Sequence, residues 1–370
     1  MMRITEKEII QYLQNSDRQY APLVIDRLEE QVNLADGYQA DAIIEFSIPD
    51  GPCFEALAEI ASVATPKNIL QKSLQLSDNI SKVNKPDIIP LLIAPYIGKK
   101  QAQMLEDKGI SWIDLSGNMY VKVSNQIYIE RSGRKNRFPD TAPIKKIFQG
   151  TSSLVSRALL LKPEGFSSLY EIVDFINERN ANITLSTVSK VIKSLEEELL
   201  ISKSGSLISV VDQEKLLDRL TEDYFYYIKR KVRKTYKFSV EKPRCYVSMT
   251  RNVQKSNYLA CGFYATQIKG LGVTNEITIS VRDMDQARRD LDFLEPDAEF
   301  GNIKLIETND VEIWFNSIDA ELTIESVIKV TIPVVDDIEL YLEMMADTPR
   351  GPKIAEQLKQ QILNKADING

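Results

Sequence analysis

The clearest alternation of hydrophobic and polar positions lies in residues 184–195. Its apolar side chains recur at spacings of three or four residues, so they share one face of a helix. These side chains are Leu185, Val188, Val191, Ile192 and Leu195. The opposite face carries short polar and basic side chains, namely Ser186, Thr187, Ser189, Lys190 and Lys193. The pattern predicts an amphipathic helix whose polar face suits base edges and phosphates.

This helix is the third in the segment 151–211. Two helical patterns precede it, and residues 180–183 (Asn-Ala-Asn-Ile) are expected to form a turn before it. Two short apolar runs on either side of the turn 203–206 predict a β-hairpin after it. Helix, helix, turn, helix and hairpin is the order of a winged helix-turn-helix. Thr184 can cap the third helix and leave backbone N–H groups for a phosphate.

Charge around this segment favours DNA binding over the alternative role of a winged helix, protein interaction. Basic clusters at 131–146 and 229–237 flank it, and clustered Lys and Arg are what the phosphate backbone requires. The acids of 196–198 limit the reading surface to the first two turns of the helix. The expected phosphate contacts are Arg134, Lys135, Arg137, Lys193, Lys203, Arg230 and Lys231.

The N-terminal part, 1–130, predicts an α-β-β-α-β-α-β unit with a mixed sheet. Residues 1–34 are expected to be helical, with a second helix at about 20–32. The strands 40–48 and 53–62 form a hairpin, which we call the acidic hairpin. Helices and short strands alternate from there to residue 130.

The acidic hairpin is a second candidate site. It is similar to the hairpin of restriction-nuclease-like domains, in which one acid and a Glu-x-Lys sequence hold Mg²⁺ and orient water. Asp41 and Glu59 match the two acids, but Ala61 stands where the pattern has Lys. Lys67 on the following helix is an alternative amine. We expect the nuclease-like fold to be present without nuclease activity. The alternative is a Mg²⁺-dependent DNA nuclease that uses Asp41 and Glu59.

The turn in 110–118 allows two interpretations. Asp114 and Asn118 could belong to a phosphate or metal site. Alternatively, Asp114 is an Asx-type turn acid and Gly117 supplies a positive φ. The second interpretation is the expectation.

The part 224–370 predicts an α+β domain that ends in two helices. Its acids at 336–343 could suggest a metal site, but they are expected to be solvated carboxylates beside a buried helix. The helices are expected at 257–268, 337–347 and 352–363, and the strands at 276–281, 311–316 and 326–332.

Composition narrows the classes of function. The 370 residues are 43% hydrophobic and 27% charged, and they contain no histidine. Ser-His-Asp and Cys-His catalysis are therefore excluded. A net charge of −7 requires that any DNA binding be local to a basic region. Widely spaced cysteines (Cys53, Cys245 and Cys261) and the lack of a long apolar run favour the cytoplasm.

Several of these patterns occur together in one known group of proteins. The stretches 167–173, 185–196 and 262–265 and the ending 338–358 resemble the AbiEi-like antitoxins and transcriptional regulators of bacterial type IV toxin–antitoxin systems. The resemblance implies binding to the operon's own promoter and neutralisation of a nucleotidyltransferase toxin without stable contact. The acidic hairpin and 110–118 look instead like the nuclease-like module that is fused to some of these regulators.

The sequence thus predicts an α+β multidomain protein. Its expected parts are a nuclease-like mixed sheet (1–130), a basic linker (131–150), a winged helix-turn-helix (151–223) and a C-terminal α+β domain (224–370). The expected function is sequence-specific binding of double-stranded DNA, as a regulator of its own operon; a protein-interaction scaffold is the non-DNA alternative. No cofactor is expected, with Mg²⁺ in the nuclease alternative. The resemblance implies a toxin encoded nearby as a possible partner. A homodimer is also possible, and no association with a membrane is expected.

Overall fold

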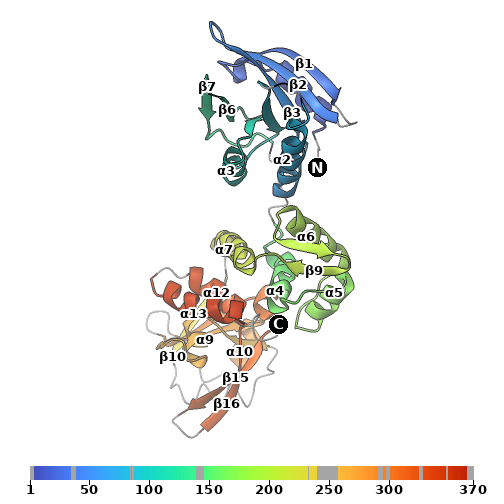
Figure 1. The fold of residues 1–370 in the computed structure, drawn as a ribbon. Coiled ribbons are helices and arrows are strands. Elements are labelled where there is room, and N and C mark those ends of the chain that lie inside the picture. The colour runs from blue at the N-terminus through green and yellow to red at the C-terminus, as the bar shows by residue number, and fades with distance from the viewer. Residues whose placement is uncertain are drawn as a thin grey trace. The chain divides into compact units, whose positions relative to one another are not determined.

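The structure is a computed structural model, and its elements fall into two compact units (Figure 1). The N-terminal unit comprises residues 1–145 with 197–199, and the C-terminal unit comprises 146–196 with 200–370. The described residues are 4–34, 39–83, 85, 87–124, 126–138, 146–231, 233–239, 257–290, 295–296, 301–324, 328–346 and 349–364. The expectation of an α+β protein with more than one compact part is confirmed. Each unit is described by itself.

The N-terminal unit is one sheet between helices. Its elements are α1 (Glu6–Gln14), β1 (Val24–Asn33), β2 (Gln39–Ser47), β3 (Cys53–Ile60), α2 (Pro66–Ile80), β4 (Ile89–Ala94), α3 (Lys99–Asp107), β5 (Ser111–Asp114), β6 (Met119–Val123) and β7 (Ile127–Arg131). The seven strands follow one another across the sheet in sequence order. The pairs β3–β4 and β4–β5 are parallel, and the other neighbours are antiparallel. The predicted mixed sheet is therefore present.

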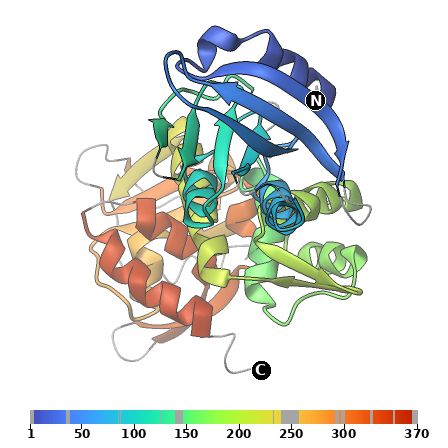
Figure 2. The ribbon, with the colours of Figure 1, turned by 45° about the horizontal axis from the view of Figure 1, so that its top comes forward.

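Both faces of this sheet are covered, as Figure 2 shows for the dark blue helix α1 on one side and for α2 and α3 on the other. Ile9 and Leu13 of α1 pack with Ile44 of β2 in one apolar cluster. Ile69 of α2 and Leu105 of α3 belong to a second cluster. Because strand side chains alternate between the two faces, one sheet supports two separate cores.

The prediction of a helix at 20–32 is wrong. The structure has the strand β1 there, paired antiparallel with β2 in the register Leu28↔Ile44 and Val32↔Ala40. A spacing of four residues, as between Leu28 and Val32, fits one face of a strand as well as one face of a helix. Pairing with β2 decides between the two, and the local sequence does not contain that information.

Along the chain, the C-terminal unit begins with helices, continues with a second seven-stranded sheet and ends with two more helices. Its first elements are α4 (Ser153–Leu161), α5 (Leu169–Asn177), α6 (Leu185–Glu197), β8 (Ile201–Ser204), β9 (Leu207–Val210) and α7 (Gln213–Arg230). The remaining elements of the unit are β10 (Thr235–Ser239), β11 (Tyr258–Ala260), α9 (Gly262–Ile268), β12 (Ile277–Val281), α10 (Met284–Asp290), β13 (Glu295–Pro296), β14 (Ile303–Glu307), α11 (Val311–Trp314), β15 (Ile318–Ile324), β16 (Ile328–Val334), α12 (Asp337–Ala346) and α13 (Gly351–Asn364). The strands of the sheet lie in the order β13-β10-β14-β12-β11-β16-β15.

Two expectations for this unit are wrong. The segment 257–268, expected to be one helix, starts with β11, which pairs with β12 and β16, and continues as α9. The strand expected at 311–316 is the short helix α11. Glu312, Ile313 and Trp314 are all buried, so the alternation that a half-exposed strand needs is absent there. The expected strands at 276–281 and 326–332 and the last two helices are present.

The expected boundaries of the linker and of the central domain also change. Ile147 and Phe148, placed in the linker, are buried in the core of the C-terminal unit. The boundary between residues 223 and 224 falls inside α7, which is continuous. One apolar cluster includes residues of α4–α7, the second sheet and α12, so the described residues of 146–196 and 200–364 pack as one unit. Lys145 and Cys245 lie outside the described residues.

None of the described helices is long and apolar enough to span a lipid bilayer.

Candidate nucleic-acid interface and acid–lysine cluster

The helix α6 has the two faces that the sequence predicts. Four of its five predicted apolar positions are buried and Leu185 is half-buried, whereas the polar face is turned to solvent. Ser186, Ser189, Lys190 and Lys193 are exposed, and Thr187 is half-buried. These five side chains therefore form one exposed surface, which we call the α6 surface.

The helix start is capped as predicted. The hydroxyl of Thr184 accepts a hydrogen bond from the backbone N–H of Thr187 at 3.3 Å, and the two hydroxyls lie 3.0 Å apart. In the preceding turn, Ile183 N–H donates to the side chain of Asn177 at 2.8 Å. Asn180 has a φ of 57°, a conformation that Asn tolerates better than most residues. The turn thus exposes the N-terminal, partially positive end of α6.

The predicted hairpin is formed by β8 and β9, with Gly205 at a φ of 60° in its turn. A third segment pairs with it: Phe166 N–H donates to the Ile208 carbonyl at 2.9 Å, and Ile208 N–H donates back at 2.8 Å. These bonds hold the hairpin against the segment between α4 and α5. The hairpin is therefore fixed by backbone hydrogen bonds to the connection between α4 and α5.

The predicted basic contacts differ in how far their charges are already engaged. Among the described residues, no carboxylate lies within ion-pair distance of Lys190 or Lys193 on α6. Lys203 of the hairpin pairs with Glu196 at 2.9 Å, so one of the acids that end α6 is neutralised by the hairpin. The two α6 lysines are thus the cations of this surface that are free to meet a phosphate.

The basic residues at the C-terminal end of α7 are less available than expected. Arg230 is exposed, but Lys231 is held by the carboxylate of Asp310 and lies 3.7 Å from Glu312. Lys231 also lies 4.4 Å from the centre of the Tyr227 ring. Its charge stabilises the fold of the C-terminal unit, so we withdraw it from the expected phosphate contacts.

The remaining predicted basic contacts belong to the N-terminal unit. Arg134, Lys135 and Arg137 are exposed. Backbone hydrogen bonds tie this segment to the 116–118 turn: Arg134 N–H donates to Asn118 at 2.8 Å, and Arg137 N–H donates to Ser116 at 3.1 Å. Residues 132–138 of the expected linker therefore pack on the N-terminal unit.

The acidic hairpin contains a cluster that the sequence only half predicts. Asp41 and Glu59 come together, and both contact the amine of Lys72 from α2, at 2.7 and 2.9 Å respectively. Asn79, two turns further along α2, donates to the other oxygen of Glu59 at 3.1 Å. Asp41 also accepts from the backbone N–H of Ile60 at 2.7 Å. We call these four side chains, Asp41, Glu59, Lys72 and Asn79, the acid–lysine cluster.

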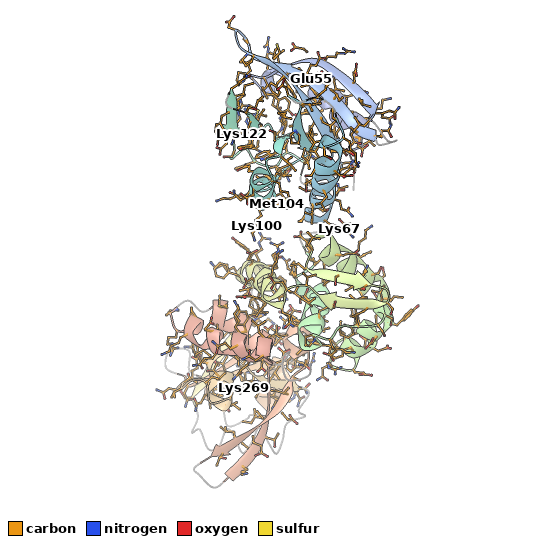
Figure 3. The ribbon with its side chains drawn as sticks, viewed as in Figure 1. Glu55, Lys67, Lys100, Met104, Lys122 and Lys269 are labelled. Atoms are coloured by element: carbon orange, nitrogen blue, oxygen red, sulfur yellow. The ribbon has the colours of Figure 1, made fainter. Side chains whose placement is uncertain are left out.

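The amine beside the two acids comes from α2 and not from the second strand of the hairpin. Ala61, at the expected Lys position, is buried, and Lys67, the substitute considered from the sequence, lies at the start of α2 (Figure 3). The sequence of α2 contains a pattern that could have identified Lys72. This lysine is three residues after the buried Ile69 and four before the buried Leu76, so it lies on the buried face of the helix. A lysine inside the buried stripe of a helix needs a counter-charge on the surface it packs against.

Burial shapes the electrostatics of this cluster. The side chain of Glu59 is fully buried, and burial raises its pKa to about 7, although the hydrogen bond from Lys72 acts in the opposite direction. For Lys72, burial lowers the pKa, but the hydrogen bonds to Asp41 and Glu59 outweigh it and the pKa is raised. Asp41 and Lys72 retain about a fifth of their side-chain exposure, so solvent reaches one side of the cluster. A buried acid with a neutral pKa beside an amine is a frequent feature of functional sites.

The 110–118 turn has the expected structural role. Asp114 accepts from the backbone N–H and the side-chain amide of Asn118, at 2.9 and 2.8 Å, and from Ile97 N–H at 3.3 Å. Gly117 has a φ of 90°. The carboxylate is thus engaged by protein donors, as an Asx-type turn requires.

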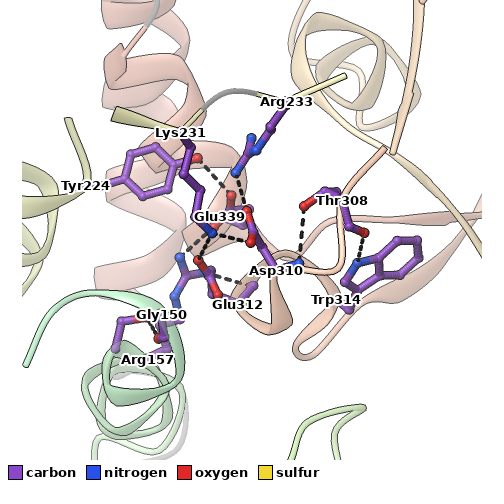
Figure 4. A network of polar contacts seen from close by, with 11 residues as sticks. Gly150, Arg157, Tyr224, Lys231, Arg233, Thr308, Asp310, Glu312, Trp314 and Glu339 are labelled. Carbon is purple, nitrogen blue, oxygen red and sulfur yellow. Dashed lines mark hydrogen bonds and ion pairs between the residues drawn. The ribbon is translucent and has the colours of Figure 1, made fainter. Parts of the chain in front are cut away.

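A buried charge network in the C-terminal unit was not predicted (Figure 4). Arg157 of α4 is buried and contacts Glu339 of α12 at 2.5 Å, and Tyr224 of α7 donates to the same carboxylate at 2.8 Å. Burial raises the pKa of the nearby Asp336 to about 6 and that of Glu343 to about 8. The acids of 336–343, expected to be solvated, therefore include buried groups that join α4, α7 and α12.

Comparison with other proteins leaves the function to be argued from this geometry. No family model, no curated protein and no solved structure matches the chain. Among the described residues there is also no group of three or more Cys, Asp or Glu side chains that could hold a metal ion.

Proposed function

We propose that this protein binds double-stranded DNA through residues 151–211, acting as a winged helix-turn-helix whose third helix, α6, enters the major groove. One observation carries the proposal: on a helix whose other face is buried, the α6 surface presents to solvent hydroxyls and two lysines that have no ion-pair partner in the described part of the chain. Ser186, Ser189 and Thr187 are proposed to contact base edges. Lys190 and Lys193 are proposed to contact phosphates or the acceptor groups of guanine.

Other contacts are secondary in this proposal. Thr184 and the start of α6 suit a phosphate because the helix dipole is positive there. Lys203 keeps 39% of its side-chain surface despite its ion pair, so the hairpin can add one contact to the backbone. Arg230 remains a further phosphate contact, and Arg134, Lys135 and Arg137 remain proposals on the N-terminal unit.

The biological role is proposed from the resemblance to AbiEi-like antitoxins. We propose that the protein regulates its own operon in the cytoplasm and that a toxin of the nucleotidyltransferase class is encoded beside it. Finding a nucleotidyltransferase gene next to the gene of this protein would support that role. Its absence is evidence for a different regulatory role, and it leaves the proposal of DNA binding untouched.

Selection of bound sequences from a random duplex pool tests the proposal. The full chain is expected to enrich one motif, and replacement of Ser189 by Asn is expected to change the enriched bases. The control is Ser81→Asn at the end of α2, outside the α6 surface, which is expected to leave the motif unchanged. Enrichment of no motif, or of the same motif after changes throughout the α6 surface, contradicts the proposal.

A second candidate function is Mg²⁺-dependent hydrolysis of DNA by the N-terminal unit, and the position of Lys72 favours it. The lysine missing from the strand is supplied by α2, so the cluster contains two carboxylates and one amine. Mg²⁺ is commonly bound by one or two carboxylates with water and substrate phosphates, so Asp41 and Glu59 suit it. The ion, held by these two residues, would polarise a phosphoryl oxygen. Lys72 would then orient the attacking water.

Cleavage of supercoiled DNA with and without Mg²⁺ tests this candidate. Activity is expected to depend on the ion and to be lost in Asp41→Ala and in Lys72→Ala. The matched control is Lys85→Ala, which removes an ion pair of the same unit, with Glu55. Cleavage that persists in both cluster variants, or no cleavage by the wild type, contradicts the nuclease alternative and leaves a structural role for the cluster.

A further inference from the structure

An open cavity of about 460 Å³ lies between α7 and α12 in the C-terminal unit. Tyr226 on one wall is 62% exposed, and Met345 on the other is 37% exposed. Large apolar side chains elsewhere in this unit are mostly buried, so two exposed ones that face a single cavity are a specific feature. The volume lies in the range that accommodates small organic ligands.

The lining of the cavity favours a positive charge. Four aromatic residues contribute to it: Tyr226 is exposed, Phe225 is half-buried, and Tyr224 and Tyr341 are buried. Two carboxylates stand beside the rings, and no lysine or arginine is among the described residues of the lining. The faces of aromatic rings and carboxylates both attract cations. An anionic ligand would meet repulsion here.

The carboxylates and one of the rings already have cationic neighbours. Lys229 lies 3.9 Å from the centre of the Phe225 ring, so the exposed ring of Tyr226 is the one that remains for a ligand cation. Asp218 lies 3.8 Å from Lys359 of α13, and Glu222 pairs with Arg219 at 2.9 Å. Both carboxylates nevertheless keep more than half of their side-chain surface exposed. They can therefore contact a ligand while holding these neighbours.

We propose that this cavity is a binding site for a small organic cation with an apolar body, such as an aromatic or alkyl ammonium compound. The charged group lies against the exposed ring of Tyr226, near the carboxylates of Asp218 and Glu222, and the apolar part contacts Met345. This proposal does not depend on DNA binding by α6.

The inner wall of the cavity is connected to the helix that begins the proposed DNA-binding segment. Tyr224 lines the cavity, its hydroxyl donates to Glu339 at 2.8 Å, and Glu339 contacts Arg157 of α4 at 2.5 Å. A ligand that moves the Tyr224 ring therefore acts on a buried ion pair that reaches α4.

Titration calorimetry of the full chain with benzyltrimethylammonium tests the proposal. Saturable binding is expected, with none for the anionic analogue benzylsulfonate. Tyr226→Ala is expected to weaken binding by about two- to fivefold, the loss of one cation–π contact at an exposed site. The matched control is Tyr170→Ala on α5, because Tyr170 is a similarly exposed tyrosine, at 67%, that does not line the cavity.

Three results would overturn the proposal. One is the absence of saturable binding, and another is equal binding of the cation and the anion. The third is a self-association of the wild type, seen by sedimentation, that Tyr226→Ala abolishes while the probe does not bind. That last result would assign the same surface to contact between two copies of the chain.

Discussion

At the scale of single residues, buried charges are the most demanding feature of both units. Glu59 in the N-terminal unit and Arg157 in the C-terminal unit are almost completely buried, and each depends on one or two partners. Removal of a single partner from such a pair leaves an uncompensated buried charge, which costs far more than the loss of a surface ion pair. These residues therefore give measurable effects when changed.

The first prediction concerns the pH dependence of stability. Burial raises the pKa of Glu59 to about 7, above 4.5 for the exposed side chain. Between these two values the folded protein keeps a proton that the unfolded chain has lost, so this group makes the free energy of unfolding fall as the pH rises. We expect Glu59→Gln to lack this decrease and to gain stability relative to the wild type as the pH rises through this interval.

Chemical denaturation at several pH values measures this difference. Glu55→Gln on the same strand is the control, because Glu55 is partly exposed and pairs with the surface residue Lys85. Its difference from the wild type is expected to vary less with pH than that of Glu59→Gln. A constant difference between Glu59→Gln and the wild type across the interval would refute a raised pKa at this position.

The second prediction concerns Arg157. Its replacement by Leu leaves the carboxylate of Glu339 buried without its partner, and we expect a loss of about 3–5 kcal/mol in the free energy of unfolding. The double variant with Glu339→Leu removes both charges and is expected to recover part of that loss. A loss below about 1 kcal/mol in Arg157→Leu would mean that the pair is worth no more than a surface ion pair.

At the scale of elements, hydrophobic periodicity predicts a helix correctly where one face of that helix is buried over several turns. The helix α6 has the predicted faces, and Thr184 caps its start as the sequence indicates. Shorter or ambiguous patterns failed, as in β1 and α11, where pairing or complete burial decides the conformation. Such information lies in contacts with distant segments and not in the segment itself.

The third prediction concerns the attachment of the hairpin to the helices. Gly165 has a φ of 92°, and an added Cβ would lie 2.5 Å from the carbonyl oxygen of Ile208. We expect Gly165→Ala to lower the free energy of unfolding by about 2 kcal/mol or more, since strain and a backbone clash combine. Thermal unfolding measures the loss.

Gly205 provides the matched comparison in the same hairpin. It also has a positive φ, of 60°, but an added Cβ would meet no atom within 4 Å. Gly205→Ala is expected to cost only the conformational strain, about 1 kcal/mol. Equal losses in the two variants would show that the close approach of Gly165 to Ile208 has no energetic effect.

At the scale of the whole molecule, the candidate sites differ in how much of them the sequence reveals. The α6 surface comes from one continuous stretch, so its residues could be predicted together. The acid–lysine cluster joins residues 13 and 31 positions apart, and the Arg157–Glu339 pair spans 182 positions. Lys72 and Arg157 were therefore missed, because neither has a local motif and each acquires its partner only through the tertiary fold.

We propose that a local basic surface on an acidic protein binds duplex DNA. The chain carries a net charge of −7, so general attraction to DNA is absent and the affinity must come from a few cations. Each phosphate contact contributes a slope of about −0.9 to the dependence of log affinity on log salt concentration. The salt dependence therefore reports the number of lysines that contact phosphate.

The most direct test measures the affinity for a selected duplex over a range of salt concentrations, for the wild type and for the variant Lys190→Glu with Lys193→Glu. The control, Lys99→Glu with Lys100→Glu on α3, has the same change in net charge. The α6 variant is expected to lose most of its affinity, and any residual binding is expected to have a salt slope smaller in magnitude by about 2. The control is expected to bind more tightly than the α6 variant. If the α6 variant binds with the affinity and the salt slope of the wild type, α6 is not the DNA-contacting helix and the account is contradicted.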